Sequence, residues 1–295
     1  MSAKSKKYLP LLAVPVLAVL VWVVAPRRAA TNEDAALLCH VGGTMTPVFE
    51  ELARAYGLRS GKTVDITSAG SGELLATIDM RREGDLYASH DPFMDVLMKR
   101  DLGVDGWCLS ELVPVMVVPE GNPKGLTGMK DLMREDVSVC LTDYTHSTLG
   151  HMLPFLFDKA GIGFAEFNAR KKVTTHRSGS HVANLVGMKS FDAGIVWQAV
   201  AHLRREVVDV VRIDDVLPVP DVDAVTSATG KRYILAPVKV TLCTLSCSSN
   251  IDAAREFVEF VLSAEGGRIL TDYGFQLPAG GARKAYENGQ KMGRK

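Results

Sequence analysis

A stretch near the N-terminus decides the fold: residues 37–72 read LLCHVGGTMTPVFEELARAYGLRSGKTVDITSAGSG. It holds two strand-like runs, 37–41 and 63–67, and apolar residues recur at helical spacing after each of them. Between strand and helix lie two glycine turns that carry a hydroxyl side chain, Gly42-Gly43-Thr44 and Gly70-Ser71-Gly72. Repeated strand–turn–helix units of this kind predict an α/β fold with parallel strands.

The two glycine turns indicate a binding site for a small oxyanion. The start of a helix exposes free backbone N–H groups and the positive end of the helix dipole, so it can hold an anion without a formal charge. Neither turn contains Lys or Arg. The alternative is that Thr44 and Ser71 only cap their own helices. Two such turns on successive units favour binding.

The composition argues against a nucleic-acid partner. The chain has 295 residues, with 34 Lys and Arg against 34 Asp and Glu, so its formal net charge is zero. Nucleic-acid binding normally leaves a basic excess or stripe. The length is enough for a substantial core in one or two domains.

The N-terminus has the pattern of an export signal. Lys4, Lys6 and Lys7 precede an apolar run over residues 8–25. A positive flank followed by an apolar segment is typical of a signal peptide or an uncleaved membrane anchor. We therefore expect residues 1–31 to be one of these and the protein to be exported, with release and anchoring both open. The alternative is a buried N-terminal helix.

The five cysteines do not indicate a disulfide scaffold. They are Cys39, Cys108, Cys140, Cys243 and Cys247. An odd number allows at most two disulfides within the chain. Three of the five lie in apolar, strand-like runs, where Cys usually behaves as a small hydrophobic residue.

Further polar turns follow later strands. A third unit, 85–88, leads into Ser89-His90-Asp91-Pro92, where His90 could contact a ligand and Asp91 could do so or cap a helix. A second set of units carries the polar turns 142–150 and 176–181 and a strand that ends at Trp197. Since open α/β sheets bind ligands at the carboxyl ends of their strands, we expect these turns to face a shared cleft.

The order of the elements predicts two lobes, with the second inserted into the first. Residues 113–119 read as a crossover strand, and residues 231–245 as the return. The expected lobes are residues 36–116 with 240–278 (lobe I) and residues 117–239 (lobe II). Residues 279–295 are expected to form a peripheral basic tail.

No motif points to catalysis. Gly70-Ser71-Gly72 lacks the full G-x-S-x-G pattern of a nucleophile elbow, and it lacks the third glycine of a dinucleotide-binding turn. The histidine pairs 146/151 and 176/181 are five residues apart, one more than the spacing that places two ligands on one helical face. We expect no enzymatic activity, no catalytic residue, no protein-bound metal cation and no cofactor.

Several short segments together resemble a known family. They are GGTMTP (42–47), AGSG (69–72), DLYAS (85–89), VVPEGNP (117–123), GIVW (194–197), SAEG (263–266) and YGF (273–275). In this order the chain resembles, over residues 36–278, the periplasmic molybdate/tungstate-binding proteins of ABC importers, a branch of the type II solute-binding proteins. The resemblance implies a two-lobed type II periplasmic-binding-protein fold, in which each lobe is a mostly parallel sheet flanked by helices.

The resemblance also implies a set of ligand-binding residues. The hydroxyl of the first turn corresponds to Thr44, where the family often has Ser, and that of the second turn to Ser71. The backbone donors of the second lobe fall near Leu149 and Val182, and the aromatic donor corresponds to Trp197, where Tyr is usual. An indole N–H can donate but cannot accept, and its bulk changes the pocket. Gly43 and Thr148 are expected to line the same site.

The function implied is capture of a small tetrahedral oxyanion and its delivery to an ABC permease. Molybdate or tungstate is the expected ligand, and sulfate or phosphate is the alternative. The protein is expected to act as a monomer in the periplasm or on the outer face of the membrane. The alternative function is a membrane-tethered domain of the same fold that senses its ligand, and an enzyme on a two-lobed scaffold comes third.

Overall fold

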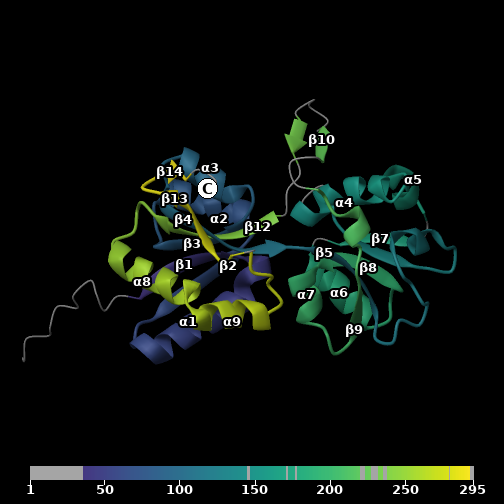
Figure 1. Cartoon of the computed structure of the whole chain (residues 1–295), viewed down its shortest axis with the longest axis horizontal. Coiled ribbons are helices and arrows are strands. Elements are labelled where there is room, and N and C mark those ends of the chain that lie inside the picture. The colour runs from purple at the N-terminus through teal and green to yellow at the C-terminus, as the bar shows by residue number, and fades with distance from the viewer. Residues whose placement is uncertain are drawn as a thin grey trace, which may run out of the picture.

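The computed structural model describes residues 36–144, 147–170, 172–176, 178–219, 223–226, 232–234, 238–278 and 280–292. These residues form two α/β lobes that lie side by side (Figure 1). The prediction of a two-lobed α/β protein is confirmed. The expected signal or anchor segment, residues 1–31, lies outside the described residues. Within the described part of the chain, no helix is long and apolar enough to span a membrane.

Lobe I is built on a seven-stranded sheet with the order β14-β13-β4-β12-β3-β1-β2. Its strands are β1 (Leu37–Gly42), β2 (Val64–Ala69), β3 (Leu86–His90), β4 (Gly103–Leu112), β12 (Val238–Leu245), β13 (Arg283–Glu287) and β14 (Gln290–Lys291). Strands β1, β2 and β3 are parallel, and β12 pairs antiparallel with both β3 and β4. The strands that carry the glycine turns therefore run in one direction at one end of the sheet.

Helices cover both faces of the lobe I sheet. They are α1 (Thr46–Ser60), α2 (Ser71–Arg81), α3 (Phe93–Lys99), α8 (Ile251–Leu262) and α9 (Ala264–Asp272). Side chains of a strand alternate between the two faces. In β3, Leu86 and Ala88 belong to the large core that includes α1 and α8, whereas Tyr87 belongs to a smaller core formed with α2 and α3. Both faces of the sheet are thus buried at β3.

Lobe II is built on a five-stranded sheet with the order β7-β6-β8-β5-β9. Its strands are β5 (Pro114–Pro119), β6 (Val139–Thr142), β7 (Val173–His176), β8 (Ala193–Trp197) and β9 (Val208–Val211). Its helices are α4 (Thr148–Lys159), α5 (Phe164–Asn168), α6 (Gly179–Gly187) and α7 (Gln198–His202). The short strands β10 (Ala224–Thr226) and β11 (Arg232–Ile234) pair with each other in a separate hairpin. Strands β6, β7 and β8 are parallel, so this lobe repeats the arrangement of lobe I.

The first crossing between the lobes is short. Strand β4 belongs to the lobe I sheet and ends at Leu112, while β5 belongs to the lobe II sheet and starts at Pro114. Only Val113 separates them, so lobe II starts three residues before the expected boundary at residue 117. The return passes from β9 to β12, which pairs with β3 and β4. Because the chain crosses in both directions, lobe II is inserted into lobe I.

Two sequence-based expectations about lobe I need correction. Residues 279–295 were expected to form a peripheral tail, but β13 pairs antiparallel with β4 and Tyr286 is buried beneath it. The ten-residue strand β4 was not predicted at all. Its sequence, GVDGWCLSEL, contains two glycines, two acids and no simple alternation, so its strand character depends on pairing with β12 and β13.

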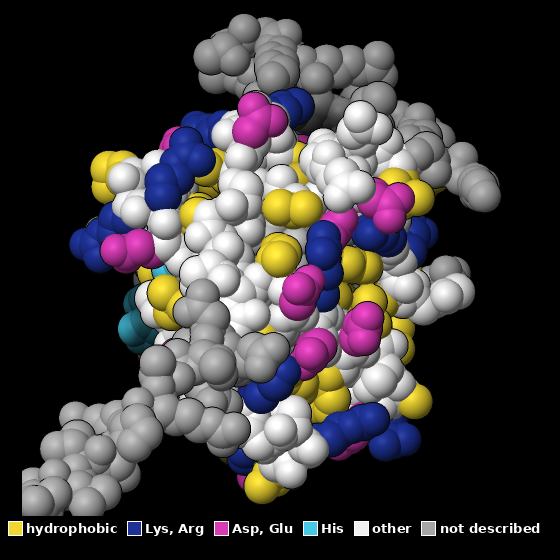
Figure 2. Space-filling model, turned by 90° about the vertical axis from the view of Figure 1, so that its left-hand side faces the viewer, with side chains coloured by type: hydrophobic (Ala, Val, Ile, Leu, Met, Phe, Trp, Pro, Cys, Tyr) yellow, Lys and Arg dark blue, Asp and Glu magenta, His cyan; other side chains and the backbone are white. Residues whose placement is uncertain are grey.

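The outer face of lobe I carries charges of both signs. Lys and Arg side chains are interspersed with Asp and Glu on this face, and hydrophobic side chains lie between them (Figure 2). All five cysteines are free, and four of them are buried.

Candidate functional site

The candidate site lies where the parallel strands of the two sheets end. In lobe I these ends are Gly42 of β1, Ala69 of β2 and His90 of β3, and in lobe II they are Thr142 of β6, His176 of β7 and Trp197 of β8. The carboxyl ends of parallel strands meet at one edge of a sheet. His90 Nδ1 lies 3.5 Å from Thr148 Oγ1, at the start of α4. The polar edges of the two lobes therefore meet.

Ser71 is the most informative residue of this region. It is the first residue of α2, and only 6% of its surface is exposed. Its Oγ is buried and has no hydrogen-bond partner among the described residues. A buried hydroxyl without a partner costs about 1–3 kcal/mol of desolvation free energy. Such a group is explained when a ligand supplies the missing hydrogen bond.

Free backbone donors lie at the same helix start as the Ser71 hydroxyl. The N-cap residue of α2 is Gly70, which has no side chain to cap the helix. The first backbone bond of the helix runs from Leu74 N to Gly70 O, at 2.9 Å. The N–H groups of Ser71, Gly72 and Glu73 precede that bond and are available to an anion.

Two close contacts fix the position of Ser71. A Cβ added at Gly42 would lie 2.5 Å from Ser71 Oγ, so β1 can approach this hydroxyl only with glycine at its end. Tyr87 Oη donates a hydrogen bond of 2.7 Å to the carbonyl oxygen of Ser71. The end of β1 and the Tyr87 side chain of β3 thus hold the start of α2 in place.

The first glycine turn lies against the second. Gly43 and Thr44 belong to a short 3-10 helix, η2 (Gly43–Met45), and Thr44 is half-buried. No hydrogen bond joins the Thr44 hydroxyl to another described residue. The neighbouring Thr46 Oγ1 lies 2.5 Å from Ser68 Oγ, which ties the two turns together. The structure therefore brings Gly43, Thr44 and Ser71 into one corner of lobe I.

In lobe II, the start of α4 uses its hydroxyl differently. Ser147 is the N-cap residue, and its Oγ accepts a 2.8 Å hydrogen bond from Gly150 N. The same hydroxyl donates to Asp143 O at 3.0 Å. The Ser147 hydroxyl therefore donates and accepts within the protein, and it acts as a helix cap. The N–H groups of Thr148 and Leu149 precede the first intrahelical bond and are available to a ligand.

Two further buried polar atoms in lobe II have no partner. Thr142, at the end of β6, is 2% exposed, and its Oγ1 makes no hydrogen bond. Gln198 follows β8, and its Oε1 is also buried without a partner. Its backbone N–H donates to Val113 O at 2.8 Å, at the crossing between the lobes. Thr142 is the first residue of the polar turn 142–150 that the sequence predicts. The sequence gives no reason to prefer it to the other hydroxyl residues of that turn, and only its burial in the structure does so.

The start of α6 offers backbone donors that differ from those expected. Ser178 caps this helix, and Val182 N donates to Ser178 O at 3.2 Å. Val182 therefore has no spare N–H, and its side chain is buried against Gly194. The N–H groups of Gly179 and Ser180 precede the first intrahelical bond. This geometry favours Gly179 and Ser180 over Val182 as donors.

Trp197 ends β8 beside the interlobe crossing. It pairs with Pro114 of β5 and is 6% exposed. Within the described parts of the chain, no hydrogen bond engages its indole N–H. That Trp197 donates to a ligand remains a prediction from the resemblance.

In the third turn of lobe I, the expected capping role of Asp91 is wrong, and His90 stays a candidate contact. Asp91 does not cap α3, whose N-cap is Pro92, because the Asp91 carboxylate accepts a 3.0 Å bond from Lys239 N in β12. Burial raises the pKa of Asp91 and lowers the pKa of His90. His90 therefore enters the site as a neutral imidazole at neutral pH.

The candidate site offers mainly neutral donors. No Lys or Arg occurs in the described turns 42–47, 69–73, 142–144, 147–150 and 178–182, where Glu73 and Asp143 are the only acids. Arg177, the charged donor of the fifth polar turn, lies outside the described residues. Among the residues that the structure describes, no group of three His, Cys, Asp or Glu side chains could hold a metal ion. The arrangement can bind an anion through dipoles and hydroxyls.

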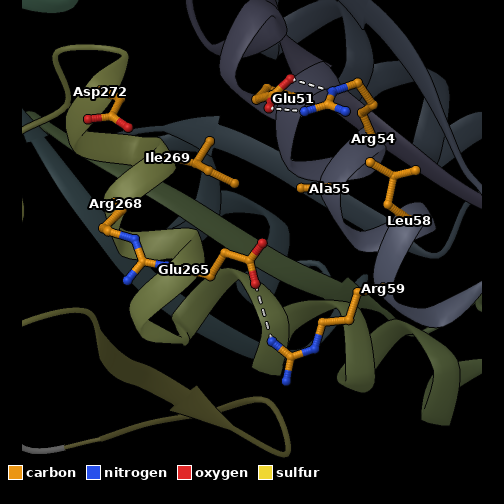
Figure 3. Close-up of a pocket in the computed structure, with 9 residues that line it drawn as sticks. All are labelled: Glu51, Arg54, Ala55, Leu58, Arg59, Glu265, Arg268, Ile269 and Asp272. Carbon is orange, nitrogen blue, oxygen red and sulfur yellow. Dashed lines mark hydrogen bonds and ion pairs between the residues drawn. The ribbon is translucent and has the colours of Figure 1, made fainter.

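A separate cavity of about 640 Å³ lies on the outside of lobe I, between α1 and α9. Figure 3 shows that its charged side chains pair with one another: Arg54 with Glu51 at 2.7 Å and Arg59 with Glu265 at 3.3 Å. These pairs neutralise two of its three arginines. This cavity lies between helices of lobe I, away from the strand ends that carry the unpartnered polar groups. We therefore place the candidate site at the strand ends.

Comparison with known proteins identifies the family of this fold. Residues 37–276 match the family model of bacterial extracellular solute-binding proteins. The chain therefore belongs to the family of bacterial extracellular solute-binding proteins.

Two curated relatives match most of the chain. It is 25% identical over 252 residues to a putative binding protein of Haemophilus influenzae, covering 84% of this chain and 93% of the relative. It is 28% identical over 221 residues to the molybdate-binding protein ModA of Mycobacterium tuberculosis, covering 74% of this chain and 75% of ModA. Both similarities extend through the two lobes.

Solved structures confirm the fold. The substrate-binding domain of a putative molybdenum ABC transporter from Clostridium difficile superposes with a TM-score of 0.64 at 19% identity, covering 82% of this chain and 98% of that one. The periplasmic molybdate-binding protein of Azotobacter vinelandii gives 0.59 at 15% identity, covering 82% and 100%. The sulfate-binding protein SubI of Mycobacterium tuberculosis gives 0.60 at 19% identity, covering 82% and 86%. At these identities the likeness concerns the fold alone.

Proposed function

We propose that this protein captures a small tetrahedral oxyanion between its two lobes and delivers it to an ABC permease at the outer face of the cytoplasmic membrane. The observation that carries the proposal is the buried, unpartnered hydroxyl of Ser71 at the uncapped start of α2. Each lobe adds helix starts with free N–H groups. A binding protein of this kind converts no substrate, and we expect no turnover.

The donors proposed for the anion come from both lobes. Lobe I offers the hydroxyls of Thr44 and Ser71, with the backbone of Gly43 and the start of α2. Lobe II offers the N–H groups of Thr148 and Leu149, those of Gly179 and Ser180 in place of Val182, and the indole of Trp197. A well-made hydrogen bond to an anion contributes about 1.5–3 kcal/mol, so a few of these donors suffice for tight binding.

Molybdate or tungstate is the ligand that we rank first. Relatives named as molybdate-binding match in sequence and in fold, which supports this rank. A sulfate-binding protein with a similar fold makes sulfate the main alternative. Neutral donors suit any of these dianions, because selectivity then depends on the size of the cleft and the geometry of the donors.

The chain passes between the lobes twice, and these two connections could act as a hinge about which the lobes close. The first passes through Val113, whose carbonyl accepts a hydrogen bond from Gln198 N. Hinge closure around a ligand would remove water from the anion and so strengthen each hydrogen bond.

A thermal-shift experiment on the purified full-length protein tests this function. Molybdate, tungstate, sulfate and phosphate would be compared at matched ionic strength, with chloride as the control. A ligand that binds only the native state, present at 100 times its Kd, stabilises that state by about 2.7 kcal/mol. We expect a clear rise in Tm with molybdate and tungstate and a smaller rise with sulfate. If none of the four anions raises Tm above the chloride control, the proposed function is wrong.

A membrane-tethered sensing domain is the second candidate. The apolar run 8–25 is followed by Pro26 and by Arg27 and Arg28, which make a poor cleavage site and favour an anchor. Fractionation of cells expressing the full chain separates the two. An anchored protein stays with the membrane after a high-salt wash, and a cleaved one appears in the soluble extracytoplasmic fraction.

A further inference from the structure

His90 bridges the two lobes at the mouth of the proposed site. It is the last residue of β3, and its Nδ1 lies 3.5 Å from Thr148 Oγ1, the first residue of α4. Its ring packs edge-on against Phe93, with centroids 5.6 Å apart, and Phe93 lies against Gly72, next to Ser71. A single imidazole thus links the anion-binding corner of lobe I to the helix start of lobe II.

The hydrogen bonds of His90 define its tautomer. Nδ1 lies 3.0 Å from the carbonyl oxygen of Asp91, which can only accept. The proton of the neutral ring is therefore on Nδ1, and Thr148 Oγ1 is a second acceptor for it. Nε2 then carries a lone pair and makes no hydrogen bond to any described residue. Protonation of Nε2 would turn this edge of the ring into a charged donor.

The charged groups near His90 do not fix the protonation state of its imidazole. Asp91 is its nearest acid, but the carboxylate of Asp91 is held by Lys239 N of β12. Lys239 and Asp95 of α3 both act on Asp91, with opposite effects on its pKa. The first turn of α4 contains no acid. Since burial lowers the pKa of His90, the ring is neutral near pH 7 in the absence of an anion.

We propose that His90 couples anion capture to proton uptake: the neutral ring gains a proton from solvent at Nε2 when a dianion is held between Ser71 and Thr148. The imidazolium then balances part of the ligand charge in a site that otherwise contains neutral donors. The inference rests on the proposed function, because it requires an anion in the cleft. It adds His90 to the residues that determine affinity.

The direction of the pH effect follows from linkage. If the anion raises the pKa of His90, the complex binds more protons than the free protein, so affinity rises as the pH falls toward the pKa of the free ring. One linked proton changes Kd by at most about tenfold per pH unit. The free protein behaves in the opposite way: its buried neutral His90 stabilises the fold above the unfolded-state pKa of about 6.5, and this contribution is lost as the pH falls below it.

Isothermal titration calorimetry tests the coupling. Purified full-length protein would be titrated with molybdate and with sulfate between about pH 5.5 and pH 8, in pairs of buffers with different ionisation enthalpies. We expect uptake of up to one proton per anion and a three- to tenfold gain in affinity per pH unit as the pH falls. His90→Gln keeps a donor for Asp91 O but cannot titrate in this range, so it should abolish both effects. His151→Gln, at an exposed position of α4, is the matched control and should keep them.

The outcomes separate this inference from the function on which it rests. If the anions bind but affinity is independent of pH, or if His90→Gln retains the pH dependence, the coupling is wrong and the binding function stands. If no anion binds to the unchanged protein at any pH, both are wrong. NMR titration of the imidazole gives a second measurement: the pKa of His90 must rise when anion is added.

Discussion

The starts of α2 and α4 look alike in sequence and do different things. Both follow a parallel strand, and both contain a serine close to a glycine. In lobe I, Ser71 is inside the helix, and its buried hydroxyl has no partner. In lobe II, Ser147 precedes the helix, and its hydroxyl both accepts from Gly150 N and donates to Asp143 O. The difference separates a hydroxyl kept for a ligand from one used for folding.

The largest expected effect concerns a glycine of α4. A Cβ at Gly150 would lie 2.0 Å from the backbone oxygen of Asp143 and 2.7 Å from Ser147 Oγ. Backbone cannot move aside as a side chain can, so Gly150→Ala should lower the free energy of unfolding by about 3 kcal/mol. Chemical denaturation measures this loss. Gly179→Ala, where the nearest side chains lie at 3.8 Å, is the matched control at the start of α6. Equal stability of the two variants would contradict the tight packing of the α4 start.

The next effect concerns the ligand and not the fold. Ser71→Ala removes a hydrogen bond that we assign to the anion, so affinity should fall roughly 10- to 100-fold. Tm of the ligand-free protein should stay the same or rise slightly, because the buried hydroxyl has no partner there to lose. Titration calorimetry and thermal unfolding measure the two quantities. An unchanged affinity would remove Ser71 from the site.

The architecture could be predicted from the sequence because its units are local. Strand, polar turn and helix follow one another closely along the chain, and β1, β2, β3 and β5 lie close to the expected ranges. Strand β4 and the docking of β13 were missed, since both depend on partners far away in the chain. Local sequence patterns contain no signal for such long-range pairing.

The site was predictable to a lesser degree. The glycines and hydroxyls of the turns could be found in the sequence. Which hydroxyl lacks a hydrogen-bond partner depends on how the folded chain packs around it. Ser147 and Ser71 differ by which N–H groups lie within reach, and Thr142 stands out only because its Oγ1 is buried. His90 could be seen as a polar residue after a strand, but its contact with Thr148 joins residues 58 positions apart.

A smaller effect should follow at the capping serine. Ser147→Ala removes the acceptor for Gly150 N, and loss of such a cap costs about 1 kcal/mol of unfolding free energy. Affinity for the anion should stay within about twofold, because the free N–H groups of Thr148 and Leu149 remain. The pair of variants therefore forms a double test: Ser71→Ala changes binding, and Ser147→Ala changes stability. A large loss of affinity in Ser147→Ala would show that both serines contact the ligand.

The smallest effect is expected at Thr44, the other hydroxyl of lobe I. Thr44 is half-buried, so in Thr44→Ala a water molecule can partly replace the hydrogen bond from the hydroxyl to the anion. The substitution should therefore weaken binding only roughly two- to fivefold. Thr44→Ser keeps the hydroxyl and is the matched control, with affinity close to that of the unchanged protein. If Thr44→Ala weakens binding as much as Ser71→Ala does, then closure of the lobes must bury both hydroxyls equally. The contrast between α2 and α4 would then extend to the whole first turn, with lobe I supplying the hydroxyls and lobe II the backbone donors.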